Sequence, residues 1–166
     1  MHLASSLRRA LLLAGALLIL AGLVLPGTAP AASAASCGTT NIALHQPTTA
    51  SSTQSASYPA ADATDGNLST RWSSAFSDPQ WLQVDLGSTQ SICQVTLYWE
   101  HAYAKAFQIQ VSADASTWTT IYSTTTGTGG TQTLNVTGSG RYIRMYGTTR
   151  ATQWGYSLWE FSVYGP

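Results

Sequence analysis

The chain has 166 residues, enough for one domain, and it is poor in charge (8%) but rich in aromatic residues, with six tryptophans and eight tyrosines. Serine and threonine fill most polar positions, a composition typical of a β-rich exported domain and not of a disordered chain. Without Arg8 and Arg9 of the leader, five of the seven basic residues remain, against seven acidic ones. A mildly acidic chain argues against nucleic acid and anionic membranes as partners.

Residues 1–35 have the pattern of a signal peptide. Two arginines precede an apolar run at 11–25, and the stretch A-A-S-A-A-S offers cleavage sites near Ala34 or Ala35. The apolar run is short for a membrane span, and nothing else in the chain could form one. We therefore expect a secreted, extracellular, monomeric domain at 36–166.

Two cysteines remain in this domain, Cys37 and Cys93. Export and an even number of cysteines favour one disulfide between them, worth roughly 4 kcal/mol in the chain-entropy model. The alternative is a lipid anchor on Cys37, which follows Ala-Ala-Ser. The residue three positions before Cys37 is not Leu, and a Pro-containing stretch separates Cys37 from the apolar run, so the disulfide is favoured.

Alternating apolar and polar residues predict short strands along the rest of the chain, bounded mostly by Gly, Pro, Asn or Asp. The expected strands are 41–44, 81–86, 92–99, 107–111, 118–122, 134–136, 141–146 and 157–164. There is no internal repeat and no long helical period. About eight short strands at spacings of roughly ten residues predict an all-β fold, a jelly-roll β-sandwich of antiparallel strands.

The inward faces of two of these strands can be read from the alternation. Leu82, Val84 and Leu86 share one face, and Ile143 shares a face with Met145. Five tryptophans that lie on strand patterns or strand edges are interpreted as core residues and not as binding platforms: Trp72, Trp81, Trp99, Trp118 and Trp159.

Four loops hold most of the polar and aromatic residues that strand packing does not explain: 45–61, 71–80, 100–106 and 147–156. In a sandwich, loops gather at the two ends, and function usually lies at one of them. The candidate ligand-contacting residues in these loops are Arg71, Asp78, Glu100, His101, Tyr103, Lys105, Arg150, Trp154 and Tyr156.

The cluster from Glu100 to Lys105 is the sharpest of these candidates. A Glu and a Lys five residues apart around Tyr103 offer an acceptor, a donor and a stacking face to one sugar. The alternative is a solvated hairpin loop. In the last loop, Trp154 either faces a ligand or folds back on the sandwich, and Tyr156, directly before a strand, is the more structural of the two.

Arg71 and Asp78 fit either of two roles, holding the site or contacting the ligand, since Arg71 can pair with Glu100 or contact a ligand directly.

Earlier in the chain, the turn Asp65-Gly66-Asn67 followed by Thr70 places a carboxylate, free carbonyls and a hydroxyl close together. These are the hard oxygen ligands that Ca²⁺ takes. An ordinary Asp-Gly turn is the alternative, because the spacing is not that of an EF-hand.

Three motifs in order, D-G-N-x-x-T-R-W, D-P-Q-W-L-Q-V-D-L-G and S-L-W-E-F-S-V-Y-G-P, resemble the discoidin (coagulation factor 5/8 type C) family. Within it, the chain is most similar to bacterial family 32 carbohydrate-binding modules, from about Asn41 to Gly165. The resemblance implies a discoidin-like jelly roll in which the terminal strands meet, with the ligand-binding loops together at one end.

The resemblance also implies a structural calcium ion. By position, its ligands would be Asp62, Asp65, Asn67, Thr70, Trp159 and Glu160. Glu160 is informative because it lies on the last strand, where an unpaired carboxylate would be costly. The ion would tie the termini together and take no part in catalysis.

Three classes of function compare as follows. An enzyme is disfavoured because no nucleophile motif is present. Glu100 and Asp78 are the only loop candidates for the two carboxylates of glycoside hydrolysis, and Lys105 is expected to lower the pKa of Glu100. The leading hypothesis is a non-catalytic carbohydrate-binding module for terminal or short sugar units of a polysaccharide, attached to glycoside hydrolases in related architectures. The stretch W-E-H-A-Y-A-K-A favours glucan or amino-sugar polymers over galactosides. The alternative is an adhesion domain for a protein or membrane surface.

Overall fold

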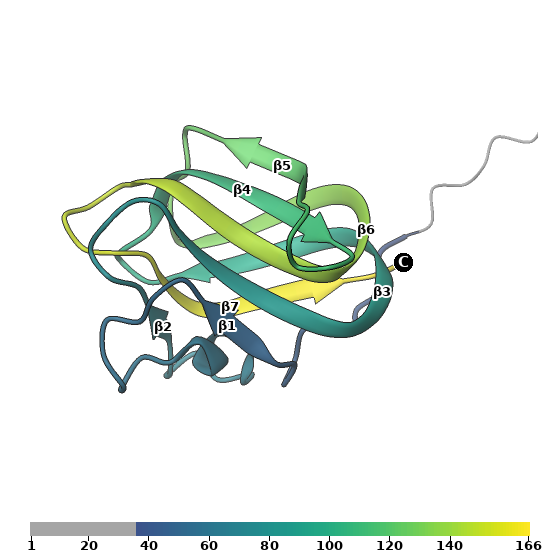
Figure 1. Ribbon diagram of the computed structural model, residues 1–166, viewed down its shortest axis with the longest axis horizontal. Helices are drawn as coiled ribbons and strands as arrows, with labels where there is room; N and C mark the ends of the chain where they lie inside the picture. The colour runs from purple at the N-terminus through teal and green to yellow at the C-terminus, as the bar shows by residue number, and fades with distance from the viewer. Residues whose placement is uncertain (1–35) are drawn as a thin grey trace, which may run out of the picture. The chain divides into compact units, whose positions relative to one another are not determined.

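The computed structural model describes residues 36–166, and the signal peptide predicted at 1–35 lies outside the described residues. This part of the chain is almost entirely β, which confirms the predicted fold class (Figure 1). Its elements are β1 (Thr48–Ala50), the 3-10 helix η1 (Ala60–Thr64), β2 (Trp72–Ser73), β3 (Gln80–Trp99), β4 (Ala104–Ser112), β5 (Thr119–Thr124), β6 (Thr131–Arg150) and β7 (Ser157–Tyr164).

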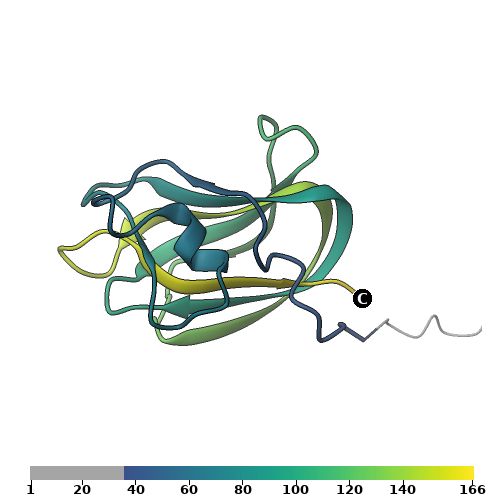
Figure 2. The same cartoon turned by 90° about the horizontal axis from the view of Figure 1, so that it is seen from below.

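The strands form one bent antiparallel sheet in the order β2-β7-β3-β6-β4-β5, with β1 added on β3. The first half of β3 pairs with β1 and with the end of β6, whereas its second half pairs with β7 and with the start of β6. The two long strands therefore pass from one layer of the sandwich to the other. Figure 2 shows the layers edge on, joined where β3 and β6 curve together.

The sequence prediction divided each long strand in two. The gaps that it left, at 87–91 and 137–140, are bends in which the chain does not reverse, because β3 and β6 bend together and are paired on both sides of the bend. Gly87 has φ +79°, a conformation that favours glycine, beside a register shift between Asp85 and Gln90. At Gly140 a Cβ would lie 2.8 Å from the Ser112 carbonyl oxygen.

Two further boundaries were wrong. The strand predicted at 41–44 is a single bridge between Asn41 and Tyr164 followed by a turn. The loop predicted at 45–61 contains β1, which pairs its three residues with β3 and extends the sheet. Both errors come from short segments whose pairing depends on distant strands and not on their own pattern.

The core lies between the layers and contains the residues that the alternation placed there. Leu82, Val84, Ile143 and Met145 are completely buried, and Leu86 is nearly so. The tryptophan prediction was only partly right. Trp72 and Trp99 are buried, but Trp81, Trp118 and Trp159 are half-buried. Trp81 and Trp159 alternate with the buried Leu82 and Leu158, so their rings lie on outer faces.

The two ends of the domain lie together. A disulfide joins Cys37 to Cys93, as predicted, and the Gly38 amide donates to the Gly165 carbonyl oxygen at 2.7 Å. Asn41 adds a bond from its Nδ2 to Ser162 Oγ at 3.2 Å. The predicted meeting of the termini is therefore present. Among residues 36–166, no helix has the length and apolar character needed to cross a membrane.

Candidate functional site

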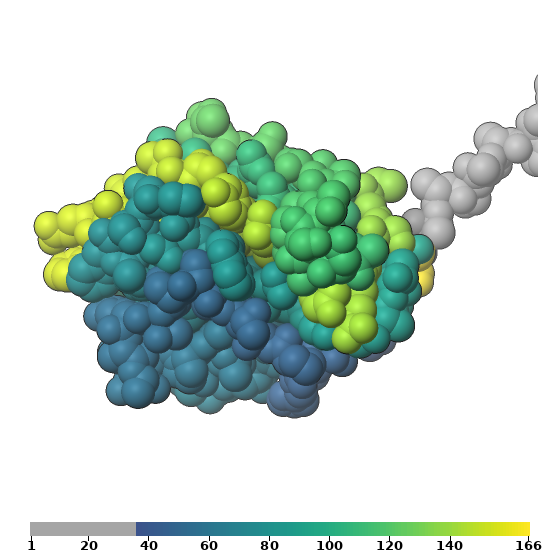
Figure 3. All heavy atoms as spheres, viewed as in Figure 1, coloured from purple at the N-terminus to yellow at the C-terminus, as the bar shows by residue number. Residues whose placement is uncertain are grey.

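The loops that follow β2, β3 and β6 meet at one end of the sandwich, at the left of Figure 1, where the yellow 150–156 segment also projects in Figure 3. Backbone bonds hold them together: Glu100 N donates to Ser157 O at 3.0 Å, and Ala151 N donates to Tyr103 O at 3.0 Å. The third loop joins through Ser74 N, which donates to Tyr156 O at 2.9 Å. The predicted convergence of loops is confirmed.

Two hollows lie side by side on this end and share Glu100 and His101. The first has a volume of about 330 Å³ and is lined by Trp99, Glu100, His101, Tyr103, Thr128, Gly129, Gly130 and Trp159. The second has a volume of about 220 Å³ and is lined by Gln54, Arg71, Ser73, Phe76, Glu100, His101, Ala102 and Trp154. Each hollow is lined both by aromatic rings and by Glu100.

The Glu100 carboxylate is held by its own loop. Its Oε2 accepts from Ala102 N at 3.0 Å and its Oε1 contacts His101 Nδ1 at 3.0 Å, while the His101 ring is almost fully exposed. Partial burial acts to raise the pKa of Glu100, but these bonds and the charge of Arg71 outweigh it and lower the pKa below its ordinary value. The carboxylate is therefore ionised and remains 21% exposed.

Arg71 lies in the second hollow as a stacked guanidinium and does not form the ion pair that the sequence suggested with Glu100. Its Cζ lies 3.9 Å from the Tyr58 ring centroid and 5.6 Å from that of Trp159, and its Nε donates to Ser157 Oγ at 3.0 Å. Arg71 acts on Glu100 only through the field of its charge. Stacking between aromatic rings fixes the guanidinium at the wall of the hollow.

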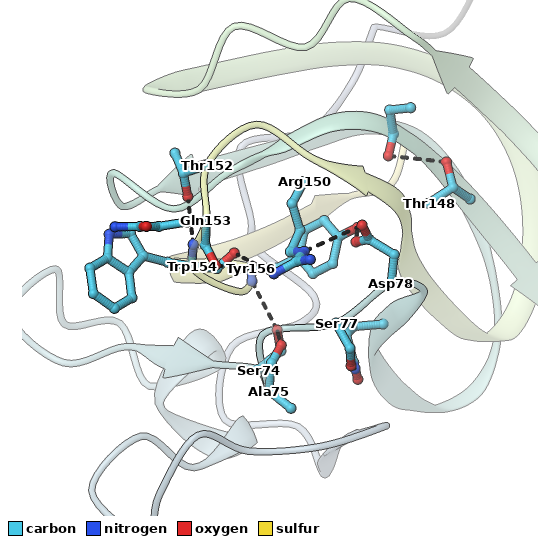
Figure 4. Close-up of polar contacts among 12 residues, drawn as sticks. Ser74, Ala75, Ser77, Asp78, Thr148, Arg150, Thr152, Gln153, Trp154 and Tyr156 are labelled. Atoms are coloured by element: carbon cyan, nitrogen blue, oxygen red, sulfur yellow. Dashed lines mark hydrogen bonds and ion pairs between the residues drawn. The ribbon is translucent and has the colours of Figure 1, made fainter.

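Trp154 is the most exposed aromatic residue of this end, at 52%, and its ring meets that of Phe76 edge to face at 5.4 Å. Phe76 is itself 44% exposed. In Figure 4 the Trp154 indole points away from the polar cluster at the base of its loop. The two rings thus form an open apolar wall on the second hollow.

A polar cluster at the base of the 150–156 loop fixes the position of Trp154 (Figure 4). Arg150 Nη1 donates to the carbonyl oxygens of Gln153 and Trp154 at 3.1 and 3.4 Å, and its Nε donates to Asp78 Oδ2 at 3.3 Å. The Tyr156 hydroxyl donates to the other Asp78 oxygen. Burial, with the Asp78 carboxylate as acceptor, raises the pKa of Tyr156 far above its ordinary value.

This arrangement corrects the role predicted for Tyr156. Its ring is completely buried, so it cannot face a ligand, and the structural alternative holds. Asp78 and Arg150 bind one another and the loop backbone, which makes them positioning residues. Lys105 lies exposed on β4 and lines neither hollow, so the low pKa of Glu100 has causes other than the predicted lysine.

Several residues of the two hollows were not predicted from the sequence. Trp159 was assigned to the core, and Phe76 and Gln54 were not singled out. Tyr58, which lines neither hollow but stacks on Arg71, was not singled out either. Phe76 could have been found, because a large apolar residue between Ala75 and Ser77 in a polar loop has nothing local to pack on.

The residues of the acidic turn at 65–70 contact one another and Glu160 of β7. Glu160 is 4% exposed, and its Oε1 accepts from the amides of Gly66 and Asn67 at 2.7 and 3.1 Å. Asp65 Oδ2 accepts from Thr70 Oγ1 at 2.7 Å. Burial raises the pKa of Glu160 to about 7, with a further contribution from the neighbouring Asp65 and opposed by the two amides. Burial and Asp65 likewise raise the pKa of Asp62.

Residues 47–161 match the F5/8 type C domain family. The chain belongs to this family. Family membership agrees with the observed β-sandwich, and it confirms the resemblance on which the sequence expectations were based.

Solved structures of family members are similar along most of the chain. Chitosan-binding module 2 of a chitosanase/glucanase from Paenibacillus sp. IK-5, in complex with chitotriose, is 50% identical with a TM-score of 0.74 and covers 75% of this chain and 100% of its own. Module 1 of the same enzyme is 49% identical with a TM-score of 0.74, over 76% and 99%. The family 32 module of AlyQ, in complex with 4,5-unsaturated mannuronic acid, is 29% identical with a TM-score of 0.61, over 70% and 92%.

A curated relative, the polysaccharide lyase 8 family protein HylA of Enterococcus faecalis, is 39% identical over 71 residues. This match covers 43% of the present chain and 5% of HylA, so the chain corresponds to a small part of that protein. The solved relatives, in contrast, are matched along nearly their whole length, and they are carbohydrate-binding modules.

Replacing Tyr156 by Phe is expected to lower the free energy of unfolding by about 1.5–3 kcal/mol, because it removes a buried hydrogen bond to a carboxylate. Urea denaturation measures this loss. The matched change Tyr142→Phe, on a half-buried ring of an outer face, is expected to cost less than about 0.5 kcal/mol. Equal losses of stability in the two variants would contradict a stabilising role for the hydrogen bond between Tyr156 and Asp78.

Proposed function

We propose that the domain is a secreted, non-catalytic carbohydrate-binding module that holds short stretches of an amino-sugar polymer of the chitosan type. The observation that carries the proposal is the ionised Glu100 carboxylate on the common wall of two hollows with aromatic linings. A protonated glucosamine unit presents an ammonium group to such a carboxylate and an apolar C–H face to an aromatic ring.

Each hollow supports one sugar unit of an oligosaccharide. In the first, Trp159 and Tyr103 provide rings, and Gly129 lets the chain pass close to Tyr103, since a Cβ there would lie 2.7 Å from the Tyr103 ring. In the second, Trp154 and Phe76 form the apolar wall. Because Glu100 borders both hollows, it can bind the ammonium group of a unit in either one.

The charge of the first hollow favours amino sugars over neutral and acidic ones, because Glu100 lines it and no Lys or Arg does. Glu100 is the carboxylate that borders both hollows, while Arg71 lies stacked against Tyr58 with its Nε bonded to Ser157. An N-acetyl group would replace the ammonium and forfeit the charge-assisted bond, so deacetylated units are preferred. The chitosan-binding modules that are about half identical to this chain support the same ligand class.

Replacing Glu100 by Gln is expected to weaken binding of a glucosamine trimer about 10- to 100-fold, the loss of one charge-assisted hydrogen bond. Isothermal titration calorimetry of the domain with chitotriose measures the change. Asp85→Asn is the matched control, because Asp85 pairs with Arg141 outside both hollows, and it should leave the affinity unchanged. Unaltered binding by Glu100→Gln would overturn the proposed site, and no binding by the wild-type domain would overturn the ligand class.

Binding should also persist in acid to an unusual extent. The ligand requires an ionised Glu100, and the pKa of that carboxyl lies below its ordinary value of 4.5. The ammonium of the sugar remains protonated as the pH falls below 4.5, so half of the affinity should be lost only below pH 4.5. Titrations at decreasing pH, with circular dichroism to verify folding, test this; half-loss of affinity above pH 4.5 would contradict it.

We also propose that a calcium ion binds at the acidic turn and has a structural role. The donors fit a hard cation: the carboxylates of Glu160 and Asp65 lie close enough to raise the pKa of Glu160, and Thr70 adds a hydroxyl. Within the described residues, no three His, Cys, Asp or Glu side chains lie close enough together to hold a metal ion, so the remaining ligands would be neutral oxygens. Asp62, Asn67 and Trp159 supply carbonyl groups nearby in the sequence.

Removing calcium with EDTA is expected to lower the melting temperature, and calcium at about a hundred times its Kd should restore about 2.7 kcal/mol. Differential scanning calorimetry detects this as a shift of roughly 2–8 °C per kcal/mol. Glu160→Gln keeps an acceptor for the Gly66 and Asn67 amides but loses the charge, so it should no longer respond to calcium. A response equal to that of the wild type would argue against Glu160 as a ligand.

A further inference from the structure

A second group of polar and aromatic side chains covers the outer face of the layer formed by β1, β3, β6, β4 and β5, away from the loops (Figure 1). Their strand neighbours Leu82, Ile143 and Ile109 are completely buried, so the alternate positions face outward. Register places one row across this face: Thr49, Gln83, Arg144, Gln110 and Thr120.

Arg144, at the centre of the row, is fixed in one position. Its Nε donates to Gln110 Oε1 at 2.7 Å, and its Cζ lies over the rings of Trp118 at 4.0 Å and Tyr146 at 4.9 Å. Gln110 is held in turn, with its Nε2 bonded to Gln108 Oε1 at 2.6 Å and Thr120 Oγ1 at 3.2 Å. A guanidinium held in this way loses little conformational freedom when it binds a ligand.

The outer edge of this guanidinium is available to a ligand. Of its three nitrogens only Nε has a partner in the described part of the chain. No buried side-chain nitrogen or oxygen there lacks a hydrogen-bond partner, so the two Nη atoms must reach solvent. Arg141 on the same strand differs, because both oxygens of Asp85 accept from it at 2.8 Å. Arg144 therefore presents an open donor fork on this face.

We propose that Arg144, Trp118 and Tyr146 form a second ligand site, which binds the carboxylate of an acidic sugar, a uronate unit of a polysaccharide. Two free Nη groups match a carboxylate, and the flanking rings can pack on the pyranose. Half-burial of Arg144, which acts to lower its pKa, makes a bound carboxylate favourable because it restores the lost solvation. The amide of Gln83, beside Arg144 in the row, can bind sugar hydroxyls.

The two sites differ in charge and so select different polymers. The first hollow of the loop end is lined by Glu100 and by no Lys or Arg, so it repels uronates and attracts ammonium groups, whereas the outer face presents a guanidinium with the opposite preference. A neutral sugar would leave the fork of Arg144 without a carboxylate, and an acidic peptide would use the fork but gain less from the rings. These differences make the uronate proposal independent of the amino-sugar proposal.

The test is a calorimetric and NMR titration of the domain with oligogalacturonides, with neutral galacto-oligosaccharides and polyglutamate as comparison ligands. Arg144→Gln is expected to weaken oligogalacturonide binding about 10- to 100-fold, the loss of a charge-assisted bidentate bond. Arg144→Lys keeps the charge but not the fork, and it should also weaken binding, by several-fold. Arg141→Gln removes the same charge from the same strand and should change affinity less than about twofold.

Each outcome decides the proposal. Chemical-shift changes at Arg144, Trp118 and Tyr146 that survive Glu100→Gln would support it. No binding of oligogalacturonides, binding lost in Glu100→Gln, or equal losses in the Arg141 and Arg144 variants would overturn it. Equal affinity for galacto-oligosaccharides would show that the carboxylate is not recognised, and equal affinity for polyglutamate that the sugar is not; either result also overturns the proposal.

Discussion

The continuous pairing of β3 with β6 holds the two layers of this domain together, and the arrangement of the loops depends on it. Both strands run from one layer into the other and bend together, so the backbone hydrogen bonds of each half support the other half. The bend requires Gly87 and Gly140, where a side chain would be strained or would meet the backbone of Ser112. A jelly roll with separate short strands would not fix the two layers in this register.

The ends of β3 and β6 determine where Glu100 and Trp154 lie. β3 ends at Trp99 and delivers Glu100 to the loop end, and β6 ends at Arg150, which clamps the segment bearing Trp154. The buried Tyr156 and its hydrogen bond to Asp78 connect the 71–80 and 147–156 loops. Mobile side chains at a ligand site cost entropy on binding, and this end of the domain reduces that cost by fixing the loops and leaving the rings of Trp154 and Phe76 open.

The sequence was sufficient for the fold class, the core alternation, the disulfide and the loops around Glu100, because each depends on a local pattern or on the motifs shared with the family. It was insufficient to predict the positions of the Trp159 and Arg71 side chains. Their positions depend on stacking between residues far apart in the chain, and a half-buried tryptophan on a strand has the same local pattern as a core one. Tyr156 shows the converse, since its place directly before a strand indicated a structural role, and its ring is buried against Gly147 with its hydroxyl bonded to Asp78.

The closure of the domain at Cys37 and Gly165 has a mechanical consequence. A force applied between these ends is carried first by the disulfide to Cys93 and by the hydrogen bonds from Gly38 to Gly165 and from Asn41 to Ser162 of β7. The C-terminal end lies at the right of Figure 1 and the loops that follow β3 and β6 lie at the left, so tension would enter the domain far from these loops. A force between the two ends would therefore be carried at the end of the domain opposite the loops.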